Sequence, residues 1–515
     1  MLSIIKSSTL IGIDGIIVKV EVDISNGIPC FSVVGLAGVA IKESRERVKS
    51  AILNSGFKFP SSRIVVNLSP ADMKKEGSYF DLPIAIGILR NLIDQEDEFL
   101  DESMFIGELS LDGKLRKVKG VLSLVINAKN KGIKRVFLPK ENENEALFIN
   151  NNEALFINNI DIIPIDNLEE CIGFLNKKIN IVKSKSCKIY EKEIYEEDFC
   201  DIKGNYFVKR GAEIAAAGNH NFLMIGPPGS GKTMIAKRIR TILPNINKEE
   251  VLEISKIYSA SGLTKDKSIV TNRPFRSPHH TATKQALIGG GIDARPGEVV
   301  LAHKGILFLD EIAEFDRRIL ETLRQPIEDK YINVSRIKMN LKYPCNTMFI
   351  GAMNPCPCGF YMSDKACKCR VNDVNRYLNK LSGPLLDRFD MFIEVNSIPY
   401  DEFNSEKVEE KSRDIKLRVE NARKIQKNRF KNENIDYNSE IKSSKLNTYC
   451  ILSNDAKETI KVIFNKYNLG NRSYTKLIKT ARTIADLNNS ETIKQKHILE
   501  AFSFRKAYYN YFMVD

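Results

Sequence analysis

The sequence has no apolar run long enough to cross a membrane, and its first twenty residues lack the unbroken apolar centre of a signal peptide. Those residues mix apolar and polar positions and carry Lys6 and Asp14. The apolar share of 43% and the charged share of 28% are typical of globular proteins rather than of disordered or fibrous ones. We therefore expect a cytoplasmic protein with no membrane partner.

Tryptophan is absent, whereas Lys, Asn and Ile are abundant along the whole chain. Lys and Arg together outnumber Asp and Glu, 78 to 65, which gives a net charge of +13. An excess of this size favours a polyanionic partner such as nucleic acid, because binding would release the counterions of the polyanion. A lysine-rich proteome would produce the same excess, so net charge alone leaves nucleic-acid binding open.

A disulfide framework is not expected, although the chain has ten cysteines in 515 residues. Four of them lie between residues 356 and 369, which indicates metal ligands or buried thiols in a reducing compartment.

The chain is too long for one hydrophobic core, and its length suggests about three or four domains.

The pattern of apolar residues divides the chain into four parts. Residues 1–175 alternate β-rich segments with helical ones and predict an α+β domain. Residues 176–200 are polar and Lys-rich, as in a linker. Residues 201–395 alternate short apolar strands with helices and predict an α/β core, and residues 396–515 are largely helical. We therefore expect a multidomain α/β fold.

The octapeptide NEALFINN occurs twice in succession, at residues 144–151 and 152–159. One copy is too short to be the repeat unit of a solenoid. We interpret the repeat as a duplication that lengthens a surface helix or loop, without a functional role.

A glycine-rich loop follows the apolar strand NFLMIG and precedes the helical segment TMIAKRIRTIL. It satisfies the phosphate-binding pattern G-x-x-x-x-G-K-[ST] in full. Backbone N–H groups and the helix N-terminus would hold the phosphates of ATP, Lys232 would reach the β and γ phosphates, and Thr233 would bind Mg²⁺. A chance match in a Gly/Pro turn is the alternative. The loop consists of Gly226, Pro227, Pro228, Gly229, Ser230, Gly231, Lys232 and Thr233.

Two acidic residues follow the next apolar strand, Ile306–Leu309. Asp310 and Glu311 would thus lie at the carboxyl end of a buried strand, where α/β sheets bind ligands. We expect Asp310 to hold the magnesium shell and Glu311 to polarise the attacking water. A solvated turn would give the same pair in isolation, but the upstream loop makes the two carboxylates its expected partners.

Two further residues suit the same chemistry. Asn354 closes the strand TMFIGAMN and is suited to hold the water against the γ phosphate, while the alternative is a turn-forming Asn before Pro355. Arg388 follows a turn in GPLLDRFDM and is suited to reach the next subunit as an arginine finger. A surface salt bridge with Asp387 or Asp390 is the alternative for Arg388.

The clustered cysteines form two C-x-C pairs separated by eight residues. Four thiolates can close a tetrahedral zinc site, which would fasten an irregular loop just after Asn354. Pairs spaced C-x-x-C are commoner in such sites, so free thiols stay the alternative. The four candidates are Cys356, Cys358, Cys367 and Cys369.

Nearly the whole chain resembles the ComM/YifB subfamily of magnesium-chelatase-like AAA+ ATPases. The resemblance is carried by FSVVGLAGVAIKESRERVKSAI, KEGSYFDLPIAIGIL, FIGELSLDGKLRKVKGVL, MIGPPGSGKT, RPFRSPHHTAT, PGEVVLAHKGILFLDE, AMNPCPCG, GPLLDRFDM and KTARTIADL. It implies a Lon-protease-like N-terminal domain of the ribosomal S5 domain 2-like type, an AAA+ core and a helical C-terminal lid. It also implies a hexameric motor that uses ATP and Mg²⁺, and a helicase that migrates DNA branches during DNA uptake and recombination.

The resemblance assigns roles to single residues. Asn354 matches the first sensor, and Arg388 matches the arginine finger. Arg472 matches the second sensor, although its neighbours in GNRSY depart from the family pattern, which usually has Ala beside the Arg. Arg482 is the alternative second sensor.

The segment YINVSRIKMNLKYPC matches the hairpin that points into the central pore of related motors. Arg336 and Lys338 lie near its tip, and we expect them to contact DNA phosphates. A solvated basic hairpin is the alternative. His279 and His280 in RSPHH have no role that the chemistry requires, so we interpret them, like His303, as hydrogen-bonded loop histidines.

The resemblance to the Lon peptidase domain does not extend to its catalytic pair, a Ser nucleophile and a Lys base. The matching positions hold Tyr79 and Leu122, Ser78 lies one place early, and Lys117 and Lys119 lie several places away. We therefore expect no proteolysis, and we assign the domain to scaffolding or DNA engagement.

Three functions compete at this point. The first is an ATP-driven translocase on single-stranded or branched DNA, the second an ATPase subunit for metal insertion into a tetrapyrrole, and the third a scaffold that uses ATP only as a switch. The Lon-like domain argues against the second, because chelatase ATPase subunits lack it. The presence of Glu311, Asn354 and Arg388 argues against the third, so the sequence predicts a DNA translocase.

Overall fold

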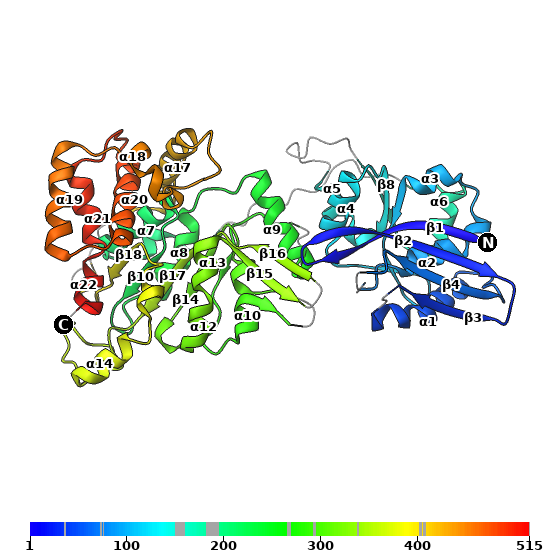
Figure 1. The fold of residues 1–515 in the computed structure, drawn as a ribbon, viewed down its shortest axis with the longest axis horizontal. Helices are drawn as coiled ribbons and strands as arrows, with labels where there is room; N and C mark the ends of the chain where they lie inside the picture. The colour runs from blue at the N-terminus through cyan, green and yellow to red at the C-terminus, as the bar shows by residue number, and fades with distance from the viewer. Residues whose placement is uncertain are drawn as a thin grey trace. The chain divides into compact units, whose positions relative to one another are not determined.

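The computed structural model describes two compact units of the chain (Figure 1). The first comprises Met1–Lys192 with Asn247–Thr271, and the second Glu193–Ile246 with Asn272–Asp515. Among the residues it describes, no helix has both the length and the apolar character that a membrane crossing requires. The description leaves out residues 36–37, 73–74, 76, 150–159, 182–194, 265–268, 292–294, 337–338, 401–403, 405–407 and 514–515.

A seven-stranded mixed sheet organises the first unit, in the order β3-β4-β2-β1-β5-β8-β9. Its β1 and β2 form a long antiparallel hairpin, and β5, β8 and β9 run parallel to β1. The strands of this sheet are β1 Leu2–Ile11, β2 Asp14–Ser25, β3 Cys30–Val34, β4 Arg63–Ser69, β5 Ser103–Phe105, β8 Arg135–Pro139 and β9 Asp161–Ile165. Strands β6 Glu108–Leu109 and β7 Leu115–Arg116 form a separate antiparallel pair. The longer helices are α1 Val39–Asn54, α2 Asp81–Ile88, α4 Val121–Asn130 and α6 Leu168–Leu175, and α3 Asp97–Asp101 and α5 Glu143–Leu147 are single turns.

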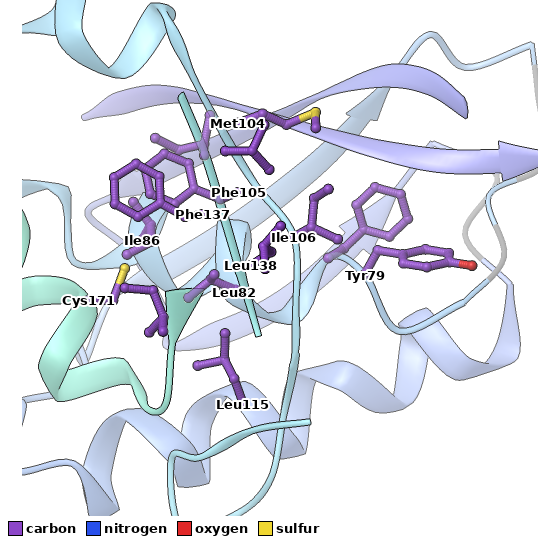
Figure 2. Close-up of a cluster of buried hydrophobic side chains, with 14 of the residues drawn as sticks. Tyr79, Leu82, Ile86, Met104, Phe105, Ile106, Leu115, Phe137, Leu138 and Cys171 are labelled. Carbon is purple, nitrogen blue, oxygen red and sulfur yellow. The ribbon is translucent and has the colours of Figure 1, made fainter. Parts of the chain in front are cut away.

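The first unit has its own hydrophobic core, part of which is shown in Figure 2. All residues of α2 are buried, and Leu82 and Ile86 from this helix belong to the same cluster as Phe105 and Phe137. The rings of Phe105 and Phe137 are stacked with their centroids 4.4 Å apart. A core of this size satisfies the requirement for a separately folded domain.

Helix α9, Lys248–Ala260, belongs to the first unit although it follows the glycine-rich loop in sequence. A capping box between Asn247 and Glu250 begins the helix, and Val251 packs against the core of the first unit. Near its end, Ser259 donates a hydrogen bond from its hydroxyl to the buried Glu145. The sequence pattern did not predict this crossing, since residues 201–395 were expected to form one core.

The second unit is built on a five-stranded parallel sheet in the order β11-β14-β17-β10-β18. Every residue of β10, β14 and β17 is buried, as in a parallel sheet covered on both faces. The strands are β10 Phe222–Ile225, β11 Phe275–Arg276, β14 Ile306–Leu309, β17 Met348–Met353 and β18 Met391–Glu394, with hairpins β12 Gly289–Gly290 to β13 Arg295–Pro296 and β15 Tyr331–Arg336 to β16 Met339–Pro344.

Helices pack around this sheet, and the C-terminal helices α19 to α22 form a group in which α22 packs against β18 (Figure 1). They share one continuous hydrophobic core with the sheet. The helices are α7 Tyr206–Gly218, α8 Lys232–Ile242, α10 Lys284–Ile288, α11 Glu298–Leu301, α12 Arg317–Thr322, α13 Arg324–Asp329, α14 Val371–Leu378, α15 Gly383–Leu386, α17 Ser412–Arg429, α18 Leu446–Tyr449, α19 Asn454–Tyr467, α20 Asn471–Leu487, α21 Gln495–Ser503 and α22 Lys506–Phe512.

The expected multidomain α/β fold with C-terminal helices is confirmed at this level. Two local expectations fall outside the described residues: most of the linker, at residues 182–194, and the second NEALFINN copy with the end of the first, at residues 150–159. The start of the first copy lies in α5.

Candidate nucleotide-binding site

The glycine-rich loop lies between the buried central strand β10 and helix α8, as its sequence context predicted. Gly229 and Gly231 have φ angles of 76° and 86°, a left-handed conformation that favours glycine. A Cβ on Gly226 would lie 2.1 Å from the carbonyl oxygen of Val395, so this position also excludes larger residues. The backbone of the loop is therefore shaped for close approach by a ligand.

Lys232, the first residue of α8, turns its side chain back over the loop. Its ammonium group donates hydrogen bonds to the carbonyl oxygens of Gly226 at 2.7 Å and Pro227 at 2.8 Å, and to Oδ1 of Asn354 at 3.2 Å. Burial lowers the pKa of Lys232 to about 8, although the nearby carboxylates of Asp310 and Glu311 act in the opposite direction. A phosphate group would offer this ammonium a stronger partner than the loop carbonyls do.

Asp310 and Glu311 follow β14 directly, and the structure brings the first of them to the loop. Oδ2 of Asp310 accepts a hydrogen bond from the hydroxyl of Thr233 at 2.6 Å. The backbone N–H of Glu311 donates to Oδ1 of Asp310 at 3.0 Å, and Glu311 itself has a φ of 47°. A hydroxyl and a carboxylate oxygen are hard ligands that suit Mg²⁺, so Thr233 and Asp310 fit the role predicted for them.

Asn354 reaches the same place because of the strand order. Strand β17 lies between β10 and β14, and Asn354 immediately follows it. The carboxyl ends of three adjacent parallel strands therefore carry the loop, Asn354 and the acidic pair side by side. The contact between Asn354 and Lys232 is the direct evidence for this convergence.

Arg388 and Arg472 lie in a different part of the second unit. Both line a cavity of about 1260 Å³ whose described lining includes no residue of the glycine-rich loop. The guanidinium of Arg388 forms an ion pair with Glu328, and its side chain is only 12% exposed. Arg472 lies 3.6 Å from Asp387 and is 62% exposed. Arg388 thus forms an ion pair with Glu328 and not with Asp387 or Asp390, the partners named for the alternative. Asp387 pairs with Arg472 instead.

Lys476 of α20 is a residue that the sequence did not single out. Its ammonium donates to the carbonyl oxygens of Asp387 and Phe389, on either side of Arg388, and lies 3.4 Å from the carboxylate of Asp390. Burial lowers the pKa of Lys476 to about 8. A lysine in an amphipathic helix gives no signal of such a role, because most such lysines face solvent. Lys476 joins the C-terminal helices to the backbone that carries Arg388.

Arg482, the alternative second sensor, is enclosed within the C-terminal helices. Its guanidinium donates to Asp486 at 3.1 Å and to the carbonyl oxygen of Glu491 at 2.6 Å, and only 1% of the side chain is exposed. These contacts are those of a structural residue.

The four clustered cysteines converge in the loop after Asn354. Their sulfur atoms all lie within 4.8 Å of one another, as ligands of one metal ion would. Backbone N–H groups of Lys368 and Phe360 stabilise the thiolate of Cys358 and lower its pKa to about 6. Each cysteine that the structure describes is a free thiol. A set of four thiolates is a donor set that suits Zn²⁺.

Comparisons with known proteins show the family of this chain. Three models of the magnesium chelatase subunit ChlI match the chain: the main model at residues 198–403, a ChlI model at residues 20–142 and the C-terminal model at residues 409–505. The chain is 40% identical over 505 residues to the uncharacterized protein YifB of Escherichia coli, covering 98% of this chain and 97% of that one. It is 38% identical over 511 residues to the competence protein ComM of Haemophilus influenzae, with the same coverage. The chain belongs to the ComM/YifB subfamily of magnesium-chelatase-like proteins.

The ComM/YifB chain also has a shorter match to the maternal DNA replication licensing factor mcm6 of Xenopus tropicalis. The two are 24% identical over 208 residues, which cover 38% of this chain and 22% of that one.

The hairpin predicted before Asn354 is present in the ComM/YifB chain as β15 and β16, paired from Tyr331 and Pro344 to Arg336 and Met339. Lys338 and the side chain of Arg336 lie outside the described residues, so their contact with DNA stays a prediction.

Two of the three loop histidines, His279 and His303, have the hydrogen-bonding partners expected of them. Nδ1 of His279 lies 2.9 Å from the hydroxyl of Thr281, and its ring is 4.1 Å from that of His280. Nδ1 of His303 accepts a hydrogen bond from the backbone N–H of Asn346 at 3.1 Å.

The two positions that match the Lon catalytic pair lie in an apolar environment. Tyr79 and Leu122 are buried in the core of the first unit, and the hydroxyl of Ser78 donates to Glu108. No described lysine contacts that hydroxyl, so the absence of proteolysis stays the prediction.

Lys232 gives the site a pH dependence that can be measured. Bound phosphates favour the charged lysine and raise its pKa above the value of about 8 that burial sets, so binding above that pH takes up a proton. We expect ATP affinity to be full below about pH 8 and to fall by up to about tenfold per pH unit above it. Titration of a fluorescent ATP analogue in magnesium buffer across this range measures the effect. An affinity that stays constant through about pH 9 would contradict it.

Proposed function

We propose that this chain is an ATP-hydrolysing motor of the ComM type, with an AAA+ core, a Lon-like N-terminal domain without peptidase activity and a helical lid. The observation that carries the proposal is the convergence of Lys232, Thr233, Asp310 and Asn354 at the carboxyl edge of one parallel sheet. Family membership supports the same conclusion.

Each residue of the site then has a chemical task. Loop amides and Lys232 bind and orient the phosphates, while Thr233 and Asp310 would hold Mg²⁺, which neutralises phosphate charge when bound. Glu311 accepts a proton from the attacking water, and Asn354 keeps that water in line. Because charge develops on the phosphate oxygens in the transition state, positive groups fixed around them lower the barrier most.

A complete site requires more than one subunit. Arg388 and Arg472 share a cavity away from the chain's own glycine-rich loop, so we propose that they act on ATP held by a neighbouring subunit. Such a head-to-tail contact repeats around a closed ring, and we propose a hexamer. Lys476 would hold the segment around Arg388 in place within each subunit.

DNA is the partner that we propose for this motor, in single-stranded or branched form. The net charge of +13 and the basic hairpin β15–β16 support it. A replication licensing factor among the relatives also supports it, although that match covers only 38% of this chain.

The test is ATP hydrolysis by the purified protein with and without single-stranded or forked DNA. We expect DNA to stimulate hydrolysis several-fold, at about 50 mM salt and less so at about 200 mM, because phosphate contacts weaken as salt rises. Lys232→Ala is the control that removes hydrolysis by this site. ATP hydrolysis without any DNA binding or stimulation would leave the ATPase and remove the DNA motor.

A magnesium-chelatase-like ATPase subunit is the second candidate, because all three matching models are named for that enzyme. This second function predicts ATP hydrolysis that responds to a tetrapyrrole-binding partner and not to DNA.

We also propose that Cys356, Cys358, Cys367 and Cys369 hold one structural Zn²⁺.

A further inference from the structure

The four-cysteine loop, residues 356–369, contacts the glycine-rich loop at Gly359. This glycine has a φ of 86°, and a Cβ placed on it would lie 2.4 Å from Cδ and 2.7 Å from Cγ of Pro228. Pro228 is the third residue of the glycine-rich loop. Its ring is rigid, so the backbone of Gly359 is seated directly against the loop that would hold the phosphates.

The sulfur cluster fixes the backbone on both sides of this contact. Cys358 precedes Gly359, and the backbone N–H of Gly359 donates to the carbonyl oxygen of Cys356 at 3.0 Å. The backbone N–H of Tyr361 donates to Sγ of Cys356 at 3.3 Å. The sulfurs of Cys356 and Cys358 lie 3.3 Å apart, and each is within 3.7 Å of the sulfur of Cys367. An ion bound by these sulfurs would close the turn that carries Gly359.

The same loop is also joined to two other elements of the second unit. Cys356 follows Asn354 after a single proline, so the cluster also anchors the end of β17. The ring of Tyr361 lies against that of Tyr511 in α22, with centroids 6.3 Å apart. The loop therefore contacts both the glycine-rich loop and the C-terminal helices.

We infer that the four-cysteine loop, closed by zinc, is a support for the glycine-rich loop, and that Gly359 is a positioning residue for phosphate binding. The inference rests on the proposed function, because it requires ATP to bind at Lys232 and Thr233. A short irregular segment has little apolar surface to hold its shape, so metal ligation supplies the order that packing does not. Metal occupancy then sets the affinity for ATP.

The decisive variant is Gly359→Ala, which leaves all four cysteines in place. Its Cβ must displace Pro228, and we expect it to retain about one zinc per chain while ATP binds at least about tenfold more weakly. Gly132→Ala is the matched control, since Gly132 has a φ of 79° with nothing within 4 Å of the added Cβ. It tests backbone strain without a clash and should bind ATP like the wild type.

Pro228→Ala, alone and combined with Gly359→Ala, tests whether the contact itself is responsible. Removing the ring makes room for the added Cβ, so the double variant should bind ATP more tightly than the product of the two single effects predicts. Multiplicative effects would show that the two residues do not act on each other.

Zinc content, the Kd of a fluorescent ATP analogue and the thermal unfolding midpoint are measured on each full-length protein. We expect a chelator to lower ATP affinity of the wild type in step with zinc loss, and re-addition of zinc to restore it. Zinc-free wild type that binds ATP with unchanged affinity, or Gly359→Ala that binds like the wild type, would overturn the inference. A wild type that retains zinc but binds no ATP would refute the proposed nucleotide site instead.

Discussion

Glu311→Gln is expected to lower kcat for ATP hydrolysis by about 10²- to 10⁴-fold while ATP still binds. The amide matches the carboxylate in size but cannot accept a proton from water. The hydrogen bond between Thr233 and Asp310 and the contacts of Lys232 do not involve the Glu311 side chain, so the phosphate and magnesium ligands stay in place. Single-turnover hydrolysis and equilibrium binding of an ATP analogue separate the two effects.

Glu314→Gln is the matched control for this prediction. Glu314 lies three residues further along and forms an ion pair with Lys380 at 3.1 Å, an exposed contact that contributes little to stability. We expect its kcat to match the wild type. If Glu311→Gln hydrolysed ATP at the wild-type rate, a different group would have to be the base.

Arg388→Ala is expected to lower kcat by about 10³-fold or more, because an arginine supplied to a neighbour's γ phosphate neutralises charge in the transition state. The decisive measurement mixes Arg388→Ala subunits with Lys232→Ala subunits, each inactive alone. In a mixed ring, about a quarter of the interfaces would pair an intact loop with an intact Arg388, and activity should return. No recovery on mixing in a stable ring would place Arg388 in its own subunit's site or outside catalysis.

The ion pair between Arg388 and Glu328 supplies the control. Glu328→Gln removes this pair but leaves the arginine, so we expect it to keep the wild-type kcat or to raise it by freeing the guanidinium. If Arg388 were needed only for the ion pair, Glu328→Gln would be as inactive as Arg388→Ala.

The nucleotide site was predictable because its signals are local and the topology is simple. The glycine-rich loop follows a short apolar strand, and Asp310 and Asn354 each follow another, so a parallel sheet brings all three to one edge. The same reasoning identified Thr233 and Asp310 as partners, and the structure joins them at 2.6 Å. The family was predicted from motifs, and the full-length relatives confirm it.

Contacts between segments far apart in sequence were not predictable in this way. The contact between Gly359 and Pro228 joins residues more than a hundred positions apart, and it has no periodic pattern in the sequence. The break at Leu323, which makes α12 and α13 two separate short helices, also has no signal in the sequence pattern. Lys476 and the pair between Arg388 and Glu328 depend on side-chain packing, about which spacing says nothing.

Because α9 belongs to the first unit, the polypeptide passes between the two units more than once. The chain passes from the first unit to the second after Lys192, returns at Asn247 and leaves again after Thr271. Three backbone connections therefore join the two units. Only the residues from Leu243 to Asn247 separate α8, which begins at Lys232, from α9. A displacement of α8 when the triphosphate is cleaved would therefore pull on the first unit through a tether of five residues. A truncated protein that begins at residue 193 would not be an independent ATPase. Without the first unit, the apolar face of α9 would be exposed to water.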